Sequence, residues 1–393
     1  MWRRFVSNTG GVFGLIYMTI LVIIAILGYL ITPDKTTYGN NMILQLANEP
    51  PGTTVTLLLI RKNQDIKDPT WLELILFGAP DKYNEVPIVD YRFEEDKIIV
   101  VPYKGDDNPM NVEEEVYNIA DVVYPLSPEF PEVFKRGDIL QFVLVDYTPM
   151  TVPISILQQK VVKEHIVDRT FWLGTDRMGR DILTRLMLGT RISLSVGFVA
   201  VLVALLIGVT LGMISGYFGG KIDNVVMWLI NVAWSIPTLL LVFALMMFLG
   251  KGLFQIFLAV GLTMWVDIAR VVRGQVIQIR EMPYVEAAKV LGINTSKILW
   301  RHILPNLIGT IMVISASNFA AAIIIEAGLS FLGLGVQPPV PSWGTMIREH
   351  YGYIMSYNPY LAMVPGIAIM LTVLAFYQIG NALRDAFDVK LVS

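Results

Sequence analysis

Six long apolar runs constrain the fold of this chain more than any other feature of its sequence. Each run is about as long as the roughly 20-residue helix that crosses a bilayer with a hydrocarbon core of about 30 Å. Only 16% of the 393 residues are charged, compared with about 25% in soluble proteins. We therefore predict an all-α polytopic membrane protein with six transmembrane helices, at Val12–Ile31, Ile192–Ile214, Val225–Leu249, Leu253–Val272, Leu307–Ala327 and Tyr360–Gly380.

The character of the sequence changes between residues 33 and 168. Short runs rich in β-branched and aromatic residues alternate there with Pro, Gly, Asn and Asp, a pattern typical of strands and turns. The predicted strands include Thr54–Ile60, Trp71–Phe77, Lys97–Tyr103 and Ile139–Tyr147. We therefore predict a water-soluble, mainly β domain inserted between the first and second transmembrane helices.

These two patterns divide the chain into segments. The first helix follows Arg3 and Arg4. We expect it to be an uncleaved anchor, because the run is longer than the apolar region of a signal peptide and no small-residue cleavage site follows it. The predicted segments are an N-terminal tip with the first helix (1–32), the β insert (33–168), an amphipathic linker (169–191) and a core of five helices (192–393) that contains a polar loop at 274–305.

Basic residues predict which side of the membrane each segment faces. The N-terminus, the turn after the second apolar run and the polar loop carry most of them, whereas the opposite short loops contribute only Lys251 and Arg348. The positive-inside rule therefore places both termini and the polar loop in the cytoplasm and the β insert outside. Several arginines between residues 169 and 191 oppose this orientation, but they follow a long loop, which weighs little in the rule.

The sequence lacks the motifs of common enzyme and nucleotide sites. Cysteine is absent, which excludes disulfides and thiol chemistry. The nearest approaches to a Walker A motif, Gly220-Lys221 and Gly250-Lys251, lack its first glycine and its final Ser or Thr. The three histidines show no metal-ligand spacing, and the net charge of −3 does not indicate a nucleic-acid partner. We expect no catalytic residue and no metal site in this chain.

A polar island between the fourth and fifth apolar runs, Glu281–Pro305, is the strongest candidate site. Its first part, Val285–Leu291, is predicted to be helical. Glu286 lies three residues before a lysine on one face of that helix, and Ala287 and Ala288 give a small surface that another protein can approach. The island therefore has the features of a docking element.

The rest of the island predicts a second helix. Gly292 is the expected stop of the first helix, because the left-handed position after a helix favours a residue without Cβ. Asn294 or Thr295 is the expected cap of the second helix, and Pro305 its expected end at the membrane. An ordinary amphipathic connection between membrane helices is the alternative interpretation of this two-helix elbow.

Three segments of the sequence resemble the permease subunits of ABC importers. Glu286-Ala287-Ala288, Gly292 and Leu304-Pro305, at this spacing, resemble the EAA loop of these subunits. The residues from Arg301 to Asn306 are similar to the dipeptide/oligopeptide/nickel branch, and two further segments, 173–181 and 326–344, resemble the same family in the same order. The chain thus resembles a C-type permease subunit, and the enlarged extracytoplasmic insert lies outside the resemblance.

The resemblance implies a type I importer permease that is not itself an enzyme and forms half of a pore for di- or oligopeptides in a bacterial or archaeal cytoplasmic membrane. A second permease subunit would complete the pore, two ATPase subunits would bind ATP and Mg²⁺ at the cytoplasmic face, and an extracytoplasmic binding protein would deliver substrate. The loop would engage the ATPase subunits through Glu286, Ala287, Ala288, Gly292, Leu304 and Pro305.

Other functions remain open at this point. Import of nickel or another small solute is the alternative within the same family. A membrane sensor with a ligand-binding β domain is the alternative from another class. An ion channel is a third, although the sequence has no filter-like loop.

Few residues of the membrane region are candidates for a translocation pathway. Pro237 is expected to break the third helix, and Ser235 either satisfies the freed backbone or faces the pathway. Glu326 lies near the outer end of the fifth helix, where it lines the pathway or sits in the interface. Asp267 is expected to pair with Arg270 or Arg273, because charges in membrane helices seek partners.

Overall fold

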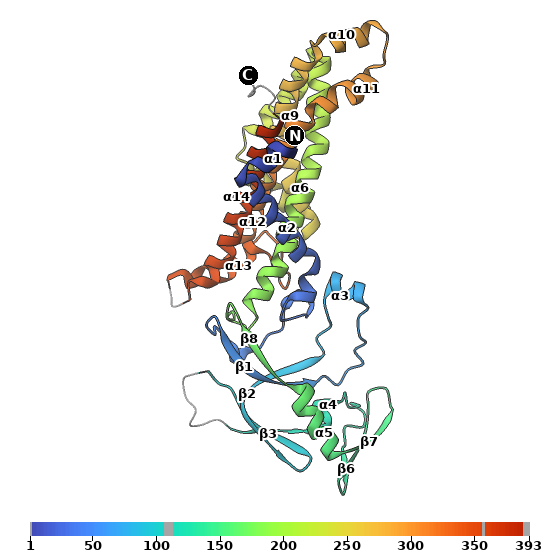
Figure 1. The fold of residues 1–393 in the computed structure, drawn as a ribbon, viewed down its shortest axis with the longest axis vertical. Helices are drawn as coiled ribbons and strands as arrows, with labels where there is room; N and C mark the ends of the chain where they lie inside the picture. Colours follow the sequence, from blue (N-terminus) through green and yellow to red (C-terminus); the bar gives the residue numbers. More distant parts are fainter. Residues whose placement is uncertain (1, 106–112, 356–357, 388–393) are drawn as a thin grey trace. The chain divides into compact units, whose positions relative to one another are not determined.

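The computed structural model describes residues 2–105, 113–355 and 358–387, drawn in Figure 1. The described chain forms two compact units. A helical unit contains residues 1–26 and 189–393, and a mixed unit, called the insert unit below, contains Leu27–Leu188. Two long helices, α2 (Thr9–Ile31) and α6 (Ile182–Phe218), begin in one unit and end in the other.

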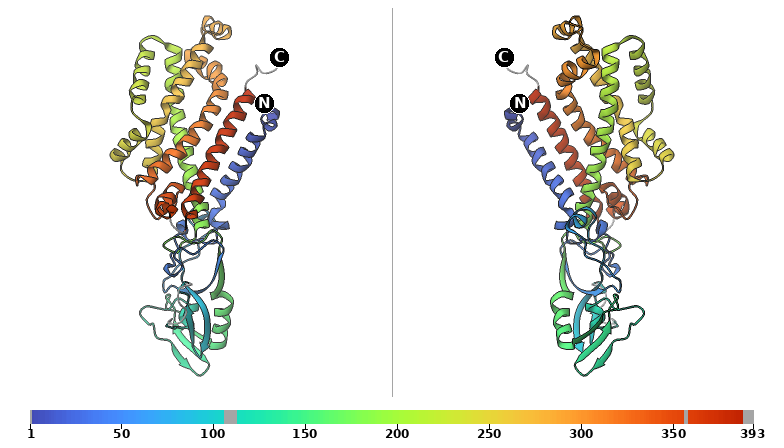
Figure 2. Two further views of the ribbon diagram at one scale, coloured as in Figure 1. Left: turned by 90° about the vertical axis from the view of Figure 1, so that its left-hand side faces the viewer. Right: turned by 90° about the vertical axis from the view of Figure 1, so that its right-hand side faces the viewer.

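Long helices dominate the helical unit, and Figure 2 shows them side by side. Within the described part of the chain, five helices are long and apolar enough to cross a membrane, and a bent pair makes six if it is counted as one span. These findings confirm a mostly helical, polytopic membrane protein. The helices that follow α6 are α7 (Gly220–Trp234), α8 (Thr238–Leu249), α9 (Leu253–Arg280), α10 (Pro283–Val290), α11 (Thr295–Ile298), η5 (Leu299–Ile303), α12 (Leu304–Phe331), α13 (Trp343–His350), η6 (Tyr351–Met355) and α14 (Tyr360–Phe387), and α1 (Trp2–Ser7) precedes α2.

The third predicted span is not one continuous helix. Its residues form α7 and α8, which meet at an angle of 92°. Pro237 lies at this break and has no N–H to continue the backbone hydrogen bonds of α7. The hydroxyl of Ser235 donates to the Val232 carbonyl at 2.7 Å, so one of the freed carbonyls is satisfied. The expected proline break is confirmed, but the bend is far larger than a kink.

The continuous membrane helices extend beyond the apolar runs that predicted them. The largest differences are at the start of α6, which begins at Ile182 instead of Ile192, and at the end of α9, which ends at Arg280 instead of Val272. Charged residues ended the apolar runs, but they do not end a helix, because arginine and lysine have good helix propensity. The expected linker at 169–191 is therefore divided between a strand, a turn and the start of α6.

Helices α6 and α9 approach closely along a stripe of glycines. A Cβ atom on Gly208, Gly212 or Gly216 would lie only 2.7–2.8 Å from a backbone carbonyl oxygen of α9. Glycines at every fourth position share one helix face, and small residues in such a stripe let membrane helices come into backbone contact. Sequence analysis missed this stripe, although its spacing was visible.

The insert unit contains two antiparallel sheets and several short helices. The five-stranded sheet has the order β4-β3-β2-β1-β8, and the three-stranded sheet has the order β5-β6-β7. The strands are β1 (Thr53–Arg61), β2 (Tyr83–Glu94), β3 (Lys97–Pro102), β4 (Glu115–Asn118), β5 (Phe134–Arg136), β6 (Ile139–Val143), β7 (Pro149–Pro153) and β8 (Ile166–Phe171). The helices are η1 (Thr37–Gly39), η2 (Leu44–Leu46), α3 (Trp71–Phe77), α4 (Ile119–Val123), α5 (Ile154–Lys160) and η4 (Val161–His165).

Most, but not all, of the predicted strands are present. Strands β1, β3 and β6 confirm three predictions, whereas Trp71–Phe77 forms helix α3 and that prediction was wrong. Thr70 and Glu73 explain the difference, because each side chain hydrogen-bonds the backbone N–H of the other in a capping box. Gly78, with φ +82°, ends the helix.

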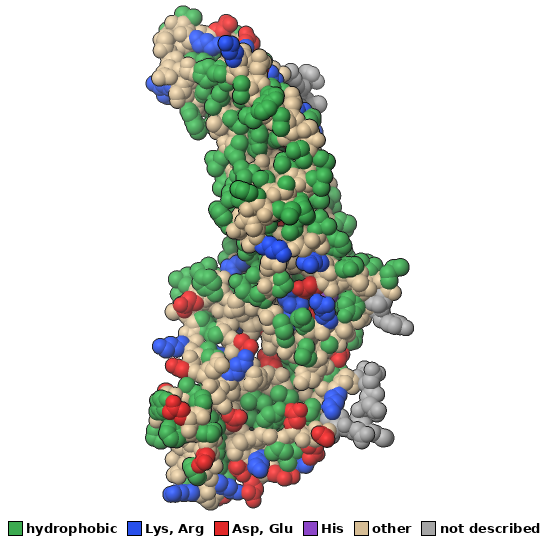
Figure 3. All heavy atoms as spheres, turned by 180° about the vertical axis from the view of Figure 1, so that it is seen from behind, with side chains coloured by type: hydrophobic (Ala, Val, Ile, Leu, Met, Phe, Trp, Pro, Cys, Tyr) green, Lys and Arg blue, Asp and Glu red, His purple; other side chains and the backbone are tan. Residues whose placement is uncertain are grey.

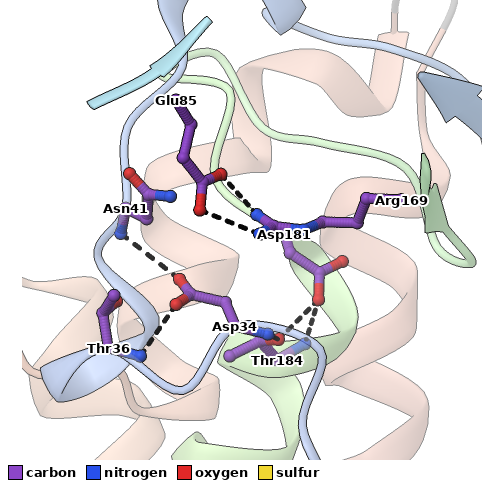
Figure 4. Close-up of polar contacts among 7 residues, drawn as sticks. All are labelled: Asp34, Thr36, Asn41, Glu85, Arg169, Asp181 and Thr184. Carbon is purple, nitrogen blue, oxygen red and sulfur yellow. Dashed lines mark hydrogen bonds and ion pairs between the residues drawn. The ribbon is translucent and has the colours of Figure 1, made fainter. Parts of the chain in front are cut away.

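Polar contacts fix the root of the insert unit, where the chain leaves α2 and enters α6 (Figure 4). The Asp34 carboxylate accepts from the backbone N–H groups of Thr36 at 2.8 Å and Asn41 at 3.3 Å. Thr184 accepts from the Asp34 backbone N–H at 3.2 Å, and its own backbone N–H donates to Asp181 at 3.0 Å. These contacts tie the segment after α2 to the first turn of α6.

An ion pair spans three neighbouring strands of the larger sheet. Arg169 on β8 donates to both carboxylate oxygens of Glu85 on β2, at 2.5 and 2.8 Å, across the strand β1 that lies between them. Both side chains are mostly buried. The bidentate geometry fixes the register of this edge of the sheet.

Candidate functional site

The polar island forms an elbow at one end of the helical unit, where α10 and α11 project in Figure 1. Helix α10 begins with Pro283, which is favourable at the first helical position because its missing N–H would have no partner there. Val285 and Ala288 are buried, three residues apart on one face. Glu286 and Ala287 are exposed on the other.

This arrangement corrects part of the expected docking surface. Ala287 is available to another protein, but Ala288 is buried in the hydrophobic core that α10 shares with α9 and α12. Its small side chain permits close packing of α10 on the subunit itself. Only one alanine of the predicted pair therefore belongs to the outer surface.

Gly292 ends α10 as the sequence predicts. Its φ is +71°, and its N–H donates to the Lys289 carbonyl at 3.0 Å. The N–H of Ile293 donates to the Ala288 carbonyl at 3.1 Å. These two bonds form a Schellman motif, which satisfies the last carbonyls of a helix and reverses the chain.

The second half of the elbow differs from the prediction. Asn294 caps α11 by accepting from the Ser296 N–H at 3.1 Å, as expected. The helix then widens into the π-turn η5, in which the Leu304 N–H donates to the carbonyl of Leu299, and continues into α12. Pro305 does not end the helix: it is the second residue of α12, directly after the widened turn.

Several contacts attach the elbow to the membrane helices. Arg280, the last residue of α9, donates to the Tyr217 carbonyl of α6 at 3.0 Å. Lys289 of α10 lies over the ring of the same tyrosine, with its Nζ 5.5 Å from the centroid. Asn306 donates to the hydroxyl of Tyr284 at 3.2 Å and so joins α12 to α10. The elbow is therefore anchored on α6, α9 and α12.

The tip of α10 exposes two large apolar side chains. Val290 is 87% exposed and Leu291 is 78% exposed. Figure 3 shows charged side chains gathered at the end of the helical unit that carries the elbow, whereas hydrophobic side chains cover the length of the helices. Exposed apolar residues within a charged end are typical of a protein contact surface.

A polar network behind the elbow was missed by sequence reasoning. Arg273 of α9 donates to both carboxylate oxygens of Asp223 of α7, each at 2.6 Å. Ser215 of α6 donates to the same carboxylate. Three helices thus meet at one side chain, and no local pattern signals this arrangement because the residues lie far apart in the sequence.

The expected partner of Asp267 was wrong. Its carboxylate accepts from the indole N–H of Trp234 at 3.2 Å. Arg273 pairs with Asp223, as described above, and the Arg270 guanidinium lies 3.5 Å from the centroid of the Trp234 ring. Trp234 thus contacts both Asp267 and Arg270, which were expected to pair directly with each other.

The three pathway candidates differ in their exposure. Ser235 and Pro237 are exposed at the break between α7 and α8. Glu326 of α12 is fully buried and accepts from the Ser330 hydroxyl at 2.7 Å. Two of the candidates are therefore exposed, and the third is enclosed within the chain.

Comparison with known proteins identifies two matching segments. Residues 208–392 match the family described as binding-protein-dependent transport system inner membrane component. Residues 1–51 match the N-terminal transmembrane domain of oligopeptide transport permease C. The two matches leave out the strands of the insert unit.

Three curated relatives are each more than 40% identical to this chain over the aligned residues. The oligopeptide transport system permease protein OppC of Bacillus subtilis is 44% identical over 220 residues, which cover 56% of this chain and 72% of that protein. The dipeptide transport system permease protein DppC of the same organism is 42% identical, covering 64% and 78%. The glutathione transport system permease protein GsiD of Pectobacterium atrosepticum is 43% identical, covering 56% and 73%. A solved inward-facing structure of the MetNI methionine ABC transporter is 20% identical with a TM-score of 0.42, covering 52% of this chain and 97% of that one.

Proposed function

Because this chain belongs to the family of binding-protein-dependent transport system inner membrane components, we propose that it is a permease subunit of an ABC importer for di- or oligopeptides. The named relatives transport oligopeptides, dipeptides and glutathione, which are all peptides. They support a peptide substrate over nickel or another small solute. Family membership also speaks against the membrane-sensor alternative.

In the proposed assembly, this chain forms half of the translocation pore and a second permease subunit forms the other half. Two ATPase subunits bind ATP and Mg²⁺ at the cytoplasmic face, and a binding protein delivers peptide from outside. Both termini and the elbow face the cytoplasm, in agreement with the positive-inside rule. The insert unit then faces outward, where it is available to the binding protein or the partner permease.

The elbow is the proposed contact with the ATPase subunits. The observation that carries this proposal is the apolar tip, Val290 and Leu291, held by the Schellman turn at Gly292. Glu286 and Ala287 lie exposed on the same helix, so an acidic side chain is available to a basic ATPase residue. Leu304 and Pro305 complete the motif and lie where the elbow joins α12.

The pathway residues receive different proposed roles. Ser235 and Pro237 are exposed at the bend of α7 and α8, which supports a place beside the pore in the assembled transporter. Glu326 is buried in the isolated subunit, close to Ser193 and Ser342 as well as Ser330. Its position supports a structural role in holding α12 against α6 and the start of α13.

An association experiment tests the proposed docking surface. The double variant Val290→Ser with Leu291→Ser should lose capture of the ATPase subunits during purification and lose peptide uptake in proteoliposomes. Met355→Ser is the matched control, because Met355 is equally exposed but belongs to η6. Normal ATPase capture by the double variant would remove the α10 tip from the proposed mechanism.

A further inference from the structure

Helix α3 of the insert unit exposes an unusual amount of apolar surface. All of its residues are described, and none is buried. Trp71 is 69% exposed and Phe77 is 64% exposed, and Leu72 and Leu76 are exposed as well. Its only charged side chain, Glu73, accepts from the backbone N–H of Thr70 at 2.8 Å and is thus held at the helix start. A helix that is apolar on all sides is expected in a core or a membrane, not in water.

The end of α3 lies against the end of the first membrane helix. A Cβ atom on Gly78 would meet the Tyr29 ring at 2.8 Å and the Lys35 carbonyl at 2.9 Å. The Ala79 N–H also donates to the Lys35 carbonyl at 2.7 Å. Tyr29 belongs to the last turn of α2, and Figure 1 shows α3 beside this helix end, away from the strands. These contacts place the end of α3 beside the last turn of α2.

We propose that α3 lies in the membrane–water interface and anchors the insert unit to the lipid surface. Its seven residues span about 10 Å at 1.5 Å per residue, which is too short to cross the bilayer but suits an interfacial helix. Tryptophan and tyrosine favour this depth because their rings have an apolar body and a polar edge. Leu30 and Ile31, at the end of α2, expose apolar side chains as well.

The charges beside α3 suit a lipid headgroup region. Lys35 and Lys67 are exposed on the segments that follow α2 and precede α3. Asp68, the acidic residue that most closely precedes α3 in the sequence, is paired with Lys82. Basic residues near a membrane surface are attracted to anionic headgroups. A lipid surface therefore satisfies both the apolar helix and the exposed lysines, whereas a protein partner would have to compete with lipid beside α2.

The absence of cysteine from the sequence permits a direct test. Leu72→Cys and Phe77→Cys variants of the full chain, each labelled with an environment-sensitive fluorophore, are placed in nanodiscs that contain phosphatidylcholine and phosphatidylglycerol. Val116→Cys is the control, because Val116 is also exposed and lies on β4, the edge strand opposite β8. Fluorescence is measured with brominated lipid and, separately, with iodide in the buffer.

The expected result is loss of fluorescence with brominated lipid and protection from iodide at positions 72 and 77, with the reverse at 116. Two results would overturn the proposal. One is iodide quenching at 72 and 77 that matches the control. The other is protection of both positions without quenching by brominated lipid, in the chain alone or after addition of the binding protein or second permease, which would assign α3 to a protein contact.

Discussion

Replacing Gly212 with alanine should destabilise the helical unit, whereas the same replacement at Gly274 should stabilise it. A Cβ atom on Gly212 would lie 2.7 Å from the Ala269 carbonyl oxygen and 2.8 Å from the Val272 Cβ, whereas nothing lies within 4 Å of one on Gly274. Overpacking costs about 1–3 kcal/mol, and alanine gains about 1 kcal/mol over glycine in a helix. We expect a net loss of about 0–2 kcal/mol at Gly212 and a gain of about 1 kcal/mol at Gly274.

The comparison of the two variants isolates packing, because the helix-propensity gain is common to both and cancels. The difference in their free energies of unfolding should be about 1–3 kcal/mol. It can be measured from the midpoints of unfolding in mixed micelles with an increasing fraction of sodium dodecyl sulfate, with helical circular dichroism as the signal. Equal stabilisation of both variants would show that α6 and α9 are not in backbone contact at Gly212, and the reasoning would fail.

Three further predictions follow from single contacts. Asp223→Asn and Arg273→Gln should each lower the free energy of unfolding by about 1.5–3 kcal/mol. The double variant should lose clearly less stability than the sum of the two single losses, because the two residues interact. Additive losses in the same micelle assay would argue against the ion pair. Gly292→Val should abolish uptake while ATP hydrolysis continues. Gly137→Val is the control and should leave transport unchanged, because no atom lies within 4 Å of a Cβ at either position and the φ of Gly137, +61°, is close to the +71° of Gly292. Normal uptake by the Gly292 variant would contradict a coupling role. Burial lowers the pKa of the His165 imidazole. The insert unit should therefore lose stability as the pH falls from about 6.5 towards the folded-state pKa, because the unfolded chain binds more protons than the folded chain in this range. Hydrogen exchange of the β1 amides should show this loss of stability, and His165→Gln should remove it.

The long apolar runs predicted most of the membrane helices because bilayer thickness imposes a length that can be counted along the sequence. The same criterion failed at helix ends, since it detects the apolar portion of a helix and not its hydrogen bonds. Helix α9 therefore continues to Arg280, beyond the run that ended at Val272. In the insert unit, periodicity failed for Trp71–Phe77, where local capping by Thr70 and Glu73 favours a helix over a strand.

The candidate site was predicted well where its features are local. The helix stop at Gly292 and the cap at Asn294 follow from backbone hydrogen bonds between near neighbours. The inward position of Ala288 could not be predicted, because it depends on how α10 packs against helices that are distant in the sequence. The contacts of Asp223 with Arg273 and Ser215 join three helices and were missed for the same reason.

The elbow and the membrane helices share one continuous core, so the elbow should move only together with them. Val285 and Ile298 of the elbow belong to the same cluster of buried residues as Val242 and Met246 of α8. Close-packed cores resist deformation and transmit displacement. Spin labels at Lys297→Cys and Met247→Cys, both exposed positions, should therefore keep the same separation in nucleotide-free and ATP-bound assemblies. A change in that distance would mean that the elbow swings independently of α8, and ATP-driven motion would then have to reach the pore by another route.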